Sequence, residues 1–326
     1  MPEYSAMTLR PYQLLCAVCS LGRSDSEVAD EKTREILEAV RQAPDMPITL
    51  RCNVGDVFAY QDIGAADDTP EGAEFNARRD LEILYRLNLT PGATLPARIL
   101  FNRMLETIEE VSGICGYPSV TAGSWRGCRK ANSGDYERGR GRGIEAIIPA
   151  RDTNIMKREK AESLAAMYKA EAISVRPHIL LCAACQCGGG TRPPFAEDNL
   201  PELIELILKK PDALLRMAPH ADWMMCAPCP YRAPGLCGCV NNKGSGGLPN
   251  ELRDLRVLQK LGLTYGSTVK ARDLYKLVFE RIPGTLEICR LDHAKPSAWW
   301  SGCGAATANS ENYDKGRQML MAAMGL

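Results

Sequence analysis

Histidine is scarce in this chain, and neither sign of charge is in excess. Only 3 of the 326 residues are histidine, and 40 Lys and Arg balance 40 Asp and Glu, so the formal net charge is zero. A balanced charge excludes a generally basic nucleic-acid binder, although local patches stay open. Aromatic residues make up only 6%, while the hydrophobic share of 45% and the charged share of 25% are typical of a globular protein.

Long hydrophobic runs are also missing. No stretch reaches the roughly 18 consecutive apolar residues that a membrane-spanning helix needs. Residues 1–13 include Glu3, Arg10 and Pro11 and lack the apolar block of a secretory signal. We therefore expect a cytoplasmic protein that binds neither membrane nor nucleic acid. The length predicts two domains, because a single core stops growing near roughly 250–300 residues.

Cysteine, by contrast, is abundant, with 14 in the chain. Two thiolates three residues apart can chelate one ion from a single turn. Disulfides need an oxidising compartment, which the expected location disfavours, and some of these thiols are expected to be buried as small hydrophobic groups. Nine of the cysteines stand in four tight clusters, which are Cys16-x-x-Cys19, Cys182-x-x-Cys185-x-Cys187, Cys226-x-x-Cys229 and Cys237-x-Cys239.

The chain repeats itself. Residues 79–115 align with residues 253–289 without a gap, and 16 of the 37 aligned pairs are identical. The segments that precede them also match, at residues 10–19 and 176–185, and Trp125-x-Gly127-Cys128 recurs as Trp300-x-Gly302-Cys303. A unit of this length can bury its own core, so the pattern predicts a duplicated domain and not a solenoid repeat.

We therefore expect an α+β fold dominated by helices, in two homologous domains related by internal duplication. The first is predicted over residues 1–143 and the second over 176–326, joined by a linker at 144–175 with one helix at 154–172. The offset between the copies grows from 166 residues at Arg10 and Arg176 to 174 at Asp80 and Asp254. The second copy thus gains an extra cysteine loop, over 226–239.

Residue patterns predict the elements of each half. The apolar run that ends in Cys-x-x-Cys reads as a strand or turn, and residues 48–52 as a short strand. Thr94 and Thr268 are predicted to cap the helices that follow them, and the glycine-rich tails, 123–143 and 302–316, are predicted loops. Hydrophobic spacing predicts helices over 31–41, 76–87 and 95–108, with counterparts over 200–210, 249–261 and 269–282.

The repeat selects four cysteines in each half as candidate ligands. Four thiolates are the number that a tetrahedral metal or a cubane cluster needs. One local pair plus two distant single cysteines favours iron–sulfur ligation, whereas structural zinc usually joins two local pairs. We expect one cluster, of [4Fe-4S] type, per half, with zinc or no metal as the alternatives. The ligands would be Cys16, Cys19, Cys115 and Cys128, and Cys182, Cys185, Cys289 and Cys303.

The extra loop provides a further candidate metal set. Its members, which have no counterpart in the first half, are Cys226, Cys229, Cys237 and Cys239. They could hold a third cluster or close a small zinc knuckle. Cys52 and Cys187 are then left over, as spare thiols or alternative ligands.

Several other residues are candidates for supporting roles. His178 precedes Cys182 by four residues, and Tyr12 holds its place in the first half, which favours a structural role. The duplicated acids Asp56 and Asp222 are predicted N-cap or turn residues. Arg140 and Arg317 recur beside the last cysteine of each half and could pair with a negatively charged cluster. The basic stretch over 125–160 is either a solvated loop or a docking patch.

The second half carries one sequence resemblance. The residues concerned are Arg176-Pro177-His178-Ile179-Leu180-Leu181-Cys182, then residues 222–229, Arg253-Asp254, Cys289 and residues 300–303. In these it resembles an uncharacterised bacterial cysteine-rich family of unknown function. It departs from the family at Ile179, because the family has a second histidine at this position. It also lacks the middle cysteine of the family's closing motif. The resemblance implies Cys182, Cys226, Cys229, Cys289 and Cys303 as ligands, and it implies no reaction.

The function expected from these patterns is that of an iron–sulfur redox protein, either an electron carrier or a cluster-dependent oxidoreductase. Its partner would be a redox protein or a small anionic substrate. Two alternatives stay open: a zinc-stabilised binding module without redox chemistry, and a thiol–disulfide redox protein that uses the Cys-x-x-Cys pairs directly.

Overall fold

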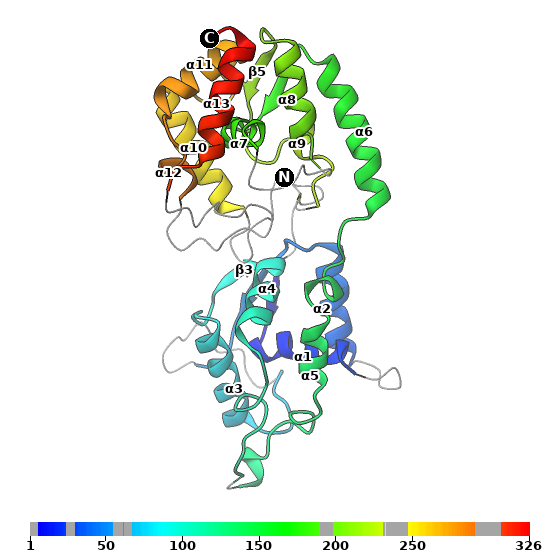
Figure 1. Ribbon diagram of the computed structural model, residues 1–326. Helices are drawn as coiled ribbons and strands as arrows, with labels where there is room; N and C mark the ends of the chain where they lie inside the picture. Colours follow the sequence, from blue (N-terminus) through cyan, green and yellow to red (C-terminus); the bar gives the residue numbers. More distant parts are fainter. Residues whose placement is uncertain are drawn as a thin grey trace. The chain divides into compact units, whose positions relative to one another are not determined.

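The chain folds into two compact units, Met1–Ala150 and Arg151–Leu326. The computed structural model describes residues 6–23, 30–54, 61, 67–120, 122–189, 198–230, 232, 247–290 and 308–326. Each unit combines several helices with one small mixed sheet, and Figure 1 shows the first from blue to green and the second from green to red. The structure is thus helix-rich α+β, as the sequence predicts.

The first unit has a three-stranded sheet in the order β1-β2-β3. β1 runs parallel to β2, with Met7 opposite Ile48, and β3 runs antiparallel to β2, with Leu95 opposite Ile48. Its elements are β1 (Met7–Leu9), α1 (Pro11–Leu21), α2 (Glu31–Gln42), β2 (Pro47–Leu50), α3 (Ala73–Arg86), β3 (Thr94–Pro96), α4 (Ala97–Thr107), η2 (Gly123–Trp125), α5 (Asp135–Gly141) and η3 (Ile144–Ala146).

The second unit has a sheet of the same kind, in the order β4-β5-β6, again with one parallel and one antiparallel pairing. Its elements are α6 (Thr153–Lys169), β4 (Ala172–Val175), α7 (Pro177–Cys187), α8 (Leu200–Lys209), β5 (Leu214–Met217), α9 (Trp223–Cys226), α10 (Leu248–Leu261), β6 (Thr268–Lys270), α11 (Ala271–Arg281), α12 (Leu286–Cys289) and α13 (Glu311–Met324).

The two units have equivalent internal hydrogen bonds as well as a similar order of elements. The Tyr136 hydroxyl donates to the Ile108 carbonyl at 2.8 Å, and the Tyr313 hydroxyl donates to the Ile282 carbonyl at the same distance. Each unit also has its own hydrophobic core, in which the helix after the first strand is almost wholly buried. Burial of a separate core is what allows each unit to be compact.

Most of the predicted helices and the predicted strand are confirmed to within a few residues. α2 shows why: Asp30 accepts a hydrogen bond from the Thr33 amide at 2.9 Å, and Ile36 and Val40 follow at helical spacing and are buried. The N-cap satisfies an amide that the helix leaves unpaired, and the apolar stripe packs on the core.

The prediction for the Cys-x-x-Cys runs is wrong, because both lie in helices, α1 and α7, and not in a strand or turn. Pro11 and Pro177 occupy the first helical position, which suits proline because its missing amide would be unpaired there. The side chain of Gln13 also accepts the Arg10 amide at 2.7 Å. A short apolar run does not by itself distinguish a strand from a buried helix.

The predicted caps Thr94 and Thr268 are also wrong. Both residues begin short strands, β3 and β6, and the following helices start at Ala97 and Ala271. The Thr94 hydroxyl instead hydrogen-bonds the Thr49 hydroxyl on the neighbouring strand at 2.8 Å. Strand pairing with β2 and β5 therefore decides the conformation of these residues, and local capping preference does not.

The glycine-rich tails are only partly loops. The first contains α5 and the second runs into α13, and these helices pack on α1 and α7 (Figure 1). A Cβ on Gly139 would overlap the carbonyl oxygen of Val18, and one on Gly316 would overlap that of Ala184. Glycine stands inside these helices because the two backbones touch, which leaves no room for a side chain.

The segment predicted as a linker contains the predicted helix, α6, and it also contributes a strand to the second unit. Its last residues form β4, which pairs with β5 in the second unit. The chain therefore enters the second unit's sheet within the stretch that the sequence assigned to the connection.

Candidate metal centre

Four cysteines of the first unit come from three separate segments. Cys16 and Cys19 are three residues apart on α1, so they share one face of the helix. Cys115 follows α4 in a turn, where its amide donates to the Val111 carbonyl at 2.9 Å, and the Cys128 amide donates to the Cys115 carbonyl at 2.8 Å. This last bond fixes the two single cysteines beside each other.

The glycine before Cys128 makes that approach feasible. Gly127 has φ 83°, and a Cβ there would lie 2.5 Å from the Cys115 carbonyl oxygen and 3.0 Å from Gly116 Cα. Only glycine adopts this conformation readily and leaves the space. The repeated Gly-Cys ending thus has a backbone reason, the close contact of residues 115–116 with 127–128.

The four thiols affect one another electrostatically, which shows that they gather in one region. Burial raises the pKa of Cys16 to about 12, and Cys128 raises it further. Burial, and then Cys16, Cys19 and Cys128, raise the pKa of Cys115. The pKa of Cys19 is raised by burial and then by Cys16 and Cys128. In the absence of a metal, Cys16, Cys19 and Cys115 are therefore neutral at physiological pH.

The gathering is looser than a single ion requires. Among the described residues, no three His, Cys, Asp or Glu side chains are arranged to hold one metal ion. Sulfurs on a tetrahedral zinc lie about 3.8 Å apart, given a Zn–S bond of about 2.3 Å. A cubane cluster has four irons between its ligands, so its cysteine sulfurs stand farther apart.

A buried arginine, which the sequence reasoning did not single out, lies beside these thiols. Arg79 on α3 is 3% exposed, and its positive charge lowers the pKa of both Cys16 and Cys115. Its Nη2 donates to Asn76 Oδ1 at 2.5 Å, but its Nε is buried without a hydrogen-bond partner. The sequence signal was available, because Arg79 recurs as Arg253 in the repeat.

The arginine that the sequence did propose for this role, Arg140, makes other contacts. Arg140 Nε donates to the Leu105 carbonyl at 2.8 Å, which ties α5 to α4. Arg317, its counterpart, lies over the Phe279 ring at 5.9 Å. In the first unit Arg79 lowers the pKa of Cys16 and Cys115, and Arg23 lowers that of Cys16 and Cys19. Arg79 reaches the cysteine helix because α3 packs directly on α1.

The second unit repeats part of this arrangement. α7 carries Cys182, Cys185 and Cys187, and Cys289 ends α12. Burial raises the pKa of Tyr313, and Cys185 and Cys289 raise it further, just as Cys19 and Cys115 act on Tyr136. Cys303, the fourth predicted ligand, lies outside the described residues.

The first pair of the extra cysteine loop sits on a well-anchored turn. Asp222 caps α9 by accepting the Met224 amide at 2.8 Å, which confirms its predicted capping role. Arg151 donates to the carbonyl oxygens of Ala227, at 2.9 Å, and of Cys229. Cys226 and Cys229 are thus held by several hydrogen bonds, whereas Cys237, Cys239 and the first-half acid Asp56 lie outside the described residues.

Each of the two leftover cysteines is packed in or against the hydrophobic core of its own unit. Cys52 is fully buried, and burial and then Asp80 raise its pKa to about 11. Cys187 is packed against the second core, and burial raises its pKa to about 11.

A buried ion pair anchors the cysteine helix in each unit. Arg10 Nε lies 2.6 Å from Asp80 Oδ2, and Arg176 Nε lies 2.8 Å from Asp254 Oδ2. Both carboxylates are fully buried, and the His178 ring nitrogen Nδ1 lies 2.6 Å from Asp254 Oδ1. Burial lowers the pKa of His178, so its neutral ring donates to the carboxylate. His178 thus supports the ion pair, which joins α7 to α10.

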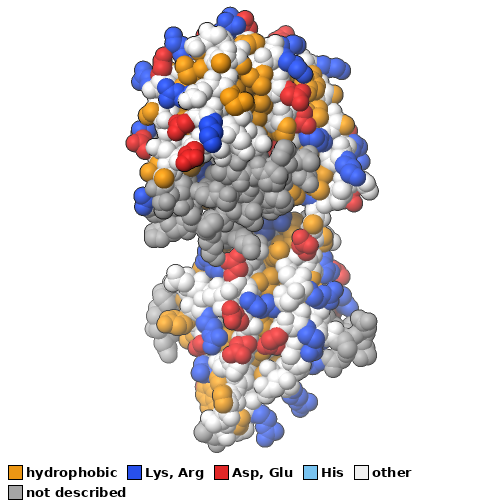
Figure 2. Space-filling view, in the orientation of Figure 1, with side chains coloured by type: hydrophobic (Ala, Val, Ile, Leu, Met, Phe, Trp, Pro, Cys, Tyr) orange, Lys and Arg blue, Asp and Glu red, His pale blue; other side chains and the backbone are white. Residues whose placement is uncertain are grey.

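The basic stretch over 125–160 is largely engaged with the protein itself. Arg142 donates to the Leu21 carbonyl at 2.6 Å, and Lys160 pairs with Glu202 at 2.9 Å. Figure 2 shows Lys and Arg side chains interspersed with Asp and Glu over the visible face of each unit. The face in view therefore carries no broad field of one sign.

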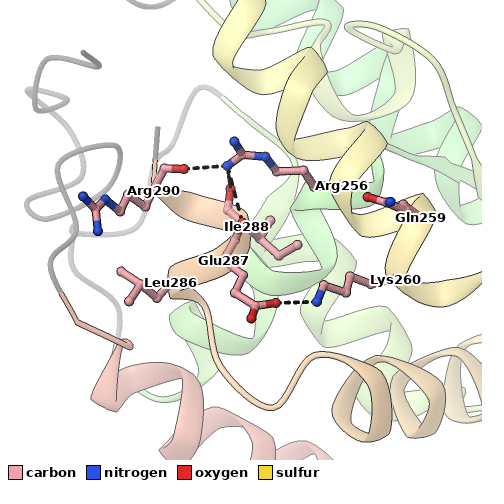
Figure 3. Close-up of a pocket in the computed structure, with 7 residues that line it drawn as sticks. All are labelled: Arg256, Gln259, Lys260, Leu286, Glu287, Ile288 and Arg290. Atoms are coloured by element: carbon pink, nitrogen blue, oxygen red, sulfur yellow. Dashed lines mark hydrogen bonds and ion pairs between the residues drawn. The ribbon is translucent and has the colours of Figure 1, made fainter. Parts of the chain in front are cut away.

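A cleft of about 620 Å³ lies next to Cys289, between α10 and α12. Figure 3 shows that Arg256 Nη1 points to the Arg290 carbonyl oxygen, at 2.5 Å, and that Lys260 pairs with Glu287. Because Arg256 and Lys260 already bind groups of this chain, the cleft offers no prepared site for a small anion.

Comparisons with family models, with curated proteins and with solved structures found no match to this chain. The resemblance to a bacterial cysteine-rich family therefore stays a prediction. Within the described part of the chain, no helix is long and apolar enough to span a membrane.

Proposed function

We propose that the protein binds iron–sulfur clusters and transfers electrons, either as a carrier or within an oxidoreductase. The observation that carries this proposal is the gathering of four thiols, from α1 and from two later segments, beside a buried arginine. The ligands in the first unit would be Cys16, Cys19, Cys115 and Cys128. When bound, the cluster would accept and release single electrons.

The number of cysteines and the charge of the neighbouring arginine both suit an iron–sulfur cluster. A cluster with four cysteine thiolates is an anion, and the unpartnered Nε of Arg79 is a buried donor next to the thiols. The pattern of one local pair plus two single cysteines favours a cluster over a single zinc ion. Zinc remains the second candidate, and metal analysis decides between them.

We infer that the second unit descends from the same ancestral domain and binds a cluster at Cys182, Cys185, Cys289 and Cys303. The shared strand order, the buried Arg–Asp pair and the tyrosine whose pKa two cysteines raise support this inference. For the extra loop we propose a third metal site, at Cys226, Cys229, Cys237 and Cys239. The anchored turn at 226–229 supports it, and a zinc knuckle or a third cluster would both use this turn.

A thiol–disulfide function receives no such support. Redox-active Cys-x-x-Cys pairs depend on a thiolate whose pKa is lowered. Here burial raises the pKa of Cys16 to about 12, so the thiol is protonated and unreactive. As a partner we propose a redox protein in the cytoplasm that exchanges electrons with the clusters.

The test is anaerobic purification of the full chain, followed by iron, zinc and acid-labile sulfide analysis and by electron paramagnetic resonance after reduction. We expect a coloured protein with about four iron and four sulfide per cluster. Stoichiometric zinc without sulfide would favour the binding module, and protein without either would refute the proposal.

A matched pair of variants assigns the ligands. Cys115→Ala removes a proposed ligand, and Cys52→Ala removes a buried thiol that lies outside the set. We expect Cys115→Ala to lose one cluster's iron and sulfide and Cys52→Ala to keep the wild-type content. Equal loss in both variants would show that the iron loss reflects damage to the core and not removal of a ligand.

A further inference from the structure

The charge of Arg79 has no anionic partner in the part of the first unit that the structure describes. An arginine guanidinium is permanently protonated, and a buried cation without a counter-ion destabilises the folded state. It is not an ordinary buried ion pair, because its hydrogen bonds go to the neutral side chains of Asn76, at 2.5 Å, and Thr69, at 3.4 Å.

Aromatic contacts offset only part of this cost. The guanidinium carbon lies 4.0 Å from the Tyr12 ring centroid and 5.1 Å from the Phe75 centroid. Such contacts stabilise a desolvated cation through the negative face of the aromatic ring. Tyr12 itself is on α1, one turn before Cys16, so the arginine is held at the cysteine helix.

The neighbouring acidic groups on which the Arg79 charge acts are the thiols, the Tyr12 hydroxyl and the Asp80 carboxyl. Arg79 acts on Cys16 and Cys115, and its Nε is buried without a partner. The nearby carboxylate of Asp80 is already bound by Arg10 Nε at 2.6 Å and by the Tyr12 amide at 3.0 Å. The missing negative charge is therefore that of the thiolates once they ligate a cluster.

We propose that Arg79 is the internal counter-ion of the first unit's cluster and raises its reduction potential. The inference rests on the proposed iron–sulfur function. Reduction adds one electron to the cluster, and a fixed positive charge nearby stabilises the added negative charge. Arg253, the counterpart, differs in the second unit, because its Nε and Nη2 donate to the Cys289 carbonyl at 3.4 and 3.3 Å.

The test compares Arg79→Gln, Arg79→Lys and Arg78→Gln in the full chain. Arg78 is the adjacent residue, and its guanidinium lies over the Tyr117 ring at 4.1 Å. Dye-mediated titration would measure the reduction potential, and urea unfolding would measure the stability of protein with and without its clusters.

For Arg79→Gln we expect a more negative reduction potential for one cluster and faster loss of its iron. In cluster-free protein we expect an unchanged or higher urea midpoint, since the variant removes an unpaired buried charge. Arg79→Lys should restore much of the potential, and Arg78→Gln should match wild type in every measurement.

The outcomes separate the two proposals. Wild-type and Arg78→Gln protein without iron and sulfide would refute the iron–sulfur function itself. If both carry clusters, an Arg79→Gln potential equal to wild type would overturn the role of Arg79. A lower urea midpoint for cluster-free Arg79→Gln would overturn it too, because that result assigns Arg79 a purely structural role.

Discussion

Replacement of Gly139 by alanine tests how the cysteine helix is held in the first unit. Gly139 is buried within α5, where that helix crosses α1. A Cβ at this position would overlap the Val18 carbonyl oxygen and would lie 3.0 Å from its carbon and 3.2 Å from the Gly22 amide nitrogen. All three atoms belong to backbone, so rotation of a side chain cannot relieve the overlap and α1 must move away from α5.

The expected cost follows from two opposing effects. Alanine favours the helix over glycine by about 1 kcal/mol, whereas an overpacked core costs about 1–3 kcal/mol. Because the clash is with backbone, we expect the upper end, which leaves a net loss of about 2 kcal/mol. Cys16 and Cys19 are on the displaced helix, so the four thiols should separate and the iron content should fall.

Gly141→Ala is the matched control, because it lies in the same helix and a Cβ there would meet nothing within 4 Å. We expect it to be neutral or to add up to about 1 kcal/mol. Urea unfolding of cluster-free protein would give the stabilities, and hydrogen exchange measured on peptides from α1 would locate the loosening. The reasoning is refuted if Gly139→Ala is as stable as Gly141→Ala and α1 exchanges at the wild-type rate.

Two more predictions concern buried ionisable groups. The pKa of Cys16 is raised to about 12 and that of Cys52 to about 11, from an ordinary thiol value of 9.0. Between pH 9 and those values the folded state thus holds more protons than the unfolded state. The stability of cluster-free protein should therefore fall as the pH rises above about 9. Equal urea midpoints at pH 8 and pH 10 would contradict this. Asp254→Asn leaves Arg176 without its fully buried partner and should cost about 3–5 kcal/mol. Glu82→Gln, in the partly exposed pair with Arg86, should cost under about 1 kcal/mol, and equal urea midpoints for these two variants would count against the buried pair.

Much of the fold was predictable because it depends on local signals. Helix α2 has an N-cap at Asp30 and apolar residues at helical spacing, and both can be read without knowing any partner. α3, α8 and α10 share the apolar spacing, although none of their N-cap residues makes a side-chain capping hydrogen bond. The repeat, which compares the chain with itself, selected the cysteines that the first unit brings together.

The failures share a physical reason, namely that each depended on a contact distant in sequence. Thr94 is a good cap by type, but pairing with Thr49 makes it a strand residue. Gly139 is typical of a loop, but the contact with Val18 places it inside a helix. Local preferences are worth about 1 kcal/mol per residue, and packing overrides them.

The sequence by itself determined which residues are available for chemistry: abundant thiols, few histidines, and a repeat that marks four cysteines in each half. The tertiary structure decided which arginine places its positive charge beside the thiols. Arg79 and Arg140 are equally repeated and equally basic in the sequence, and only the packing of α3 against α1 places Arg79 beside Cys16 and Cys115. The reason is that electrostatic effects depend on distance and burial, and both arise only when the chain folds.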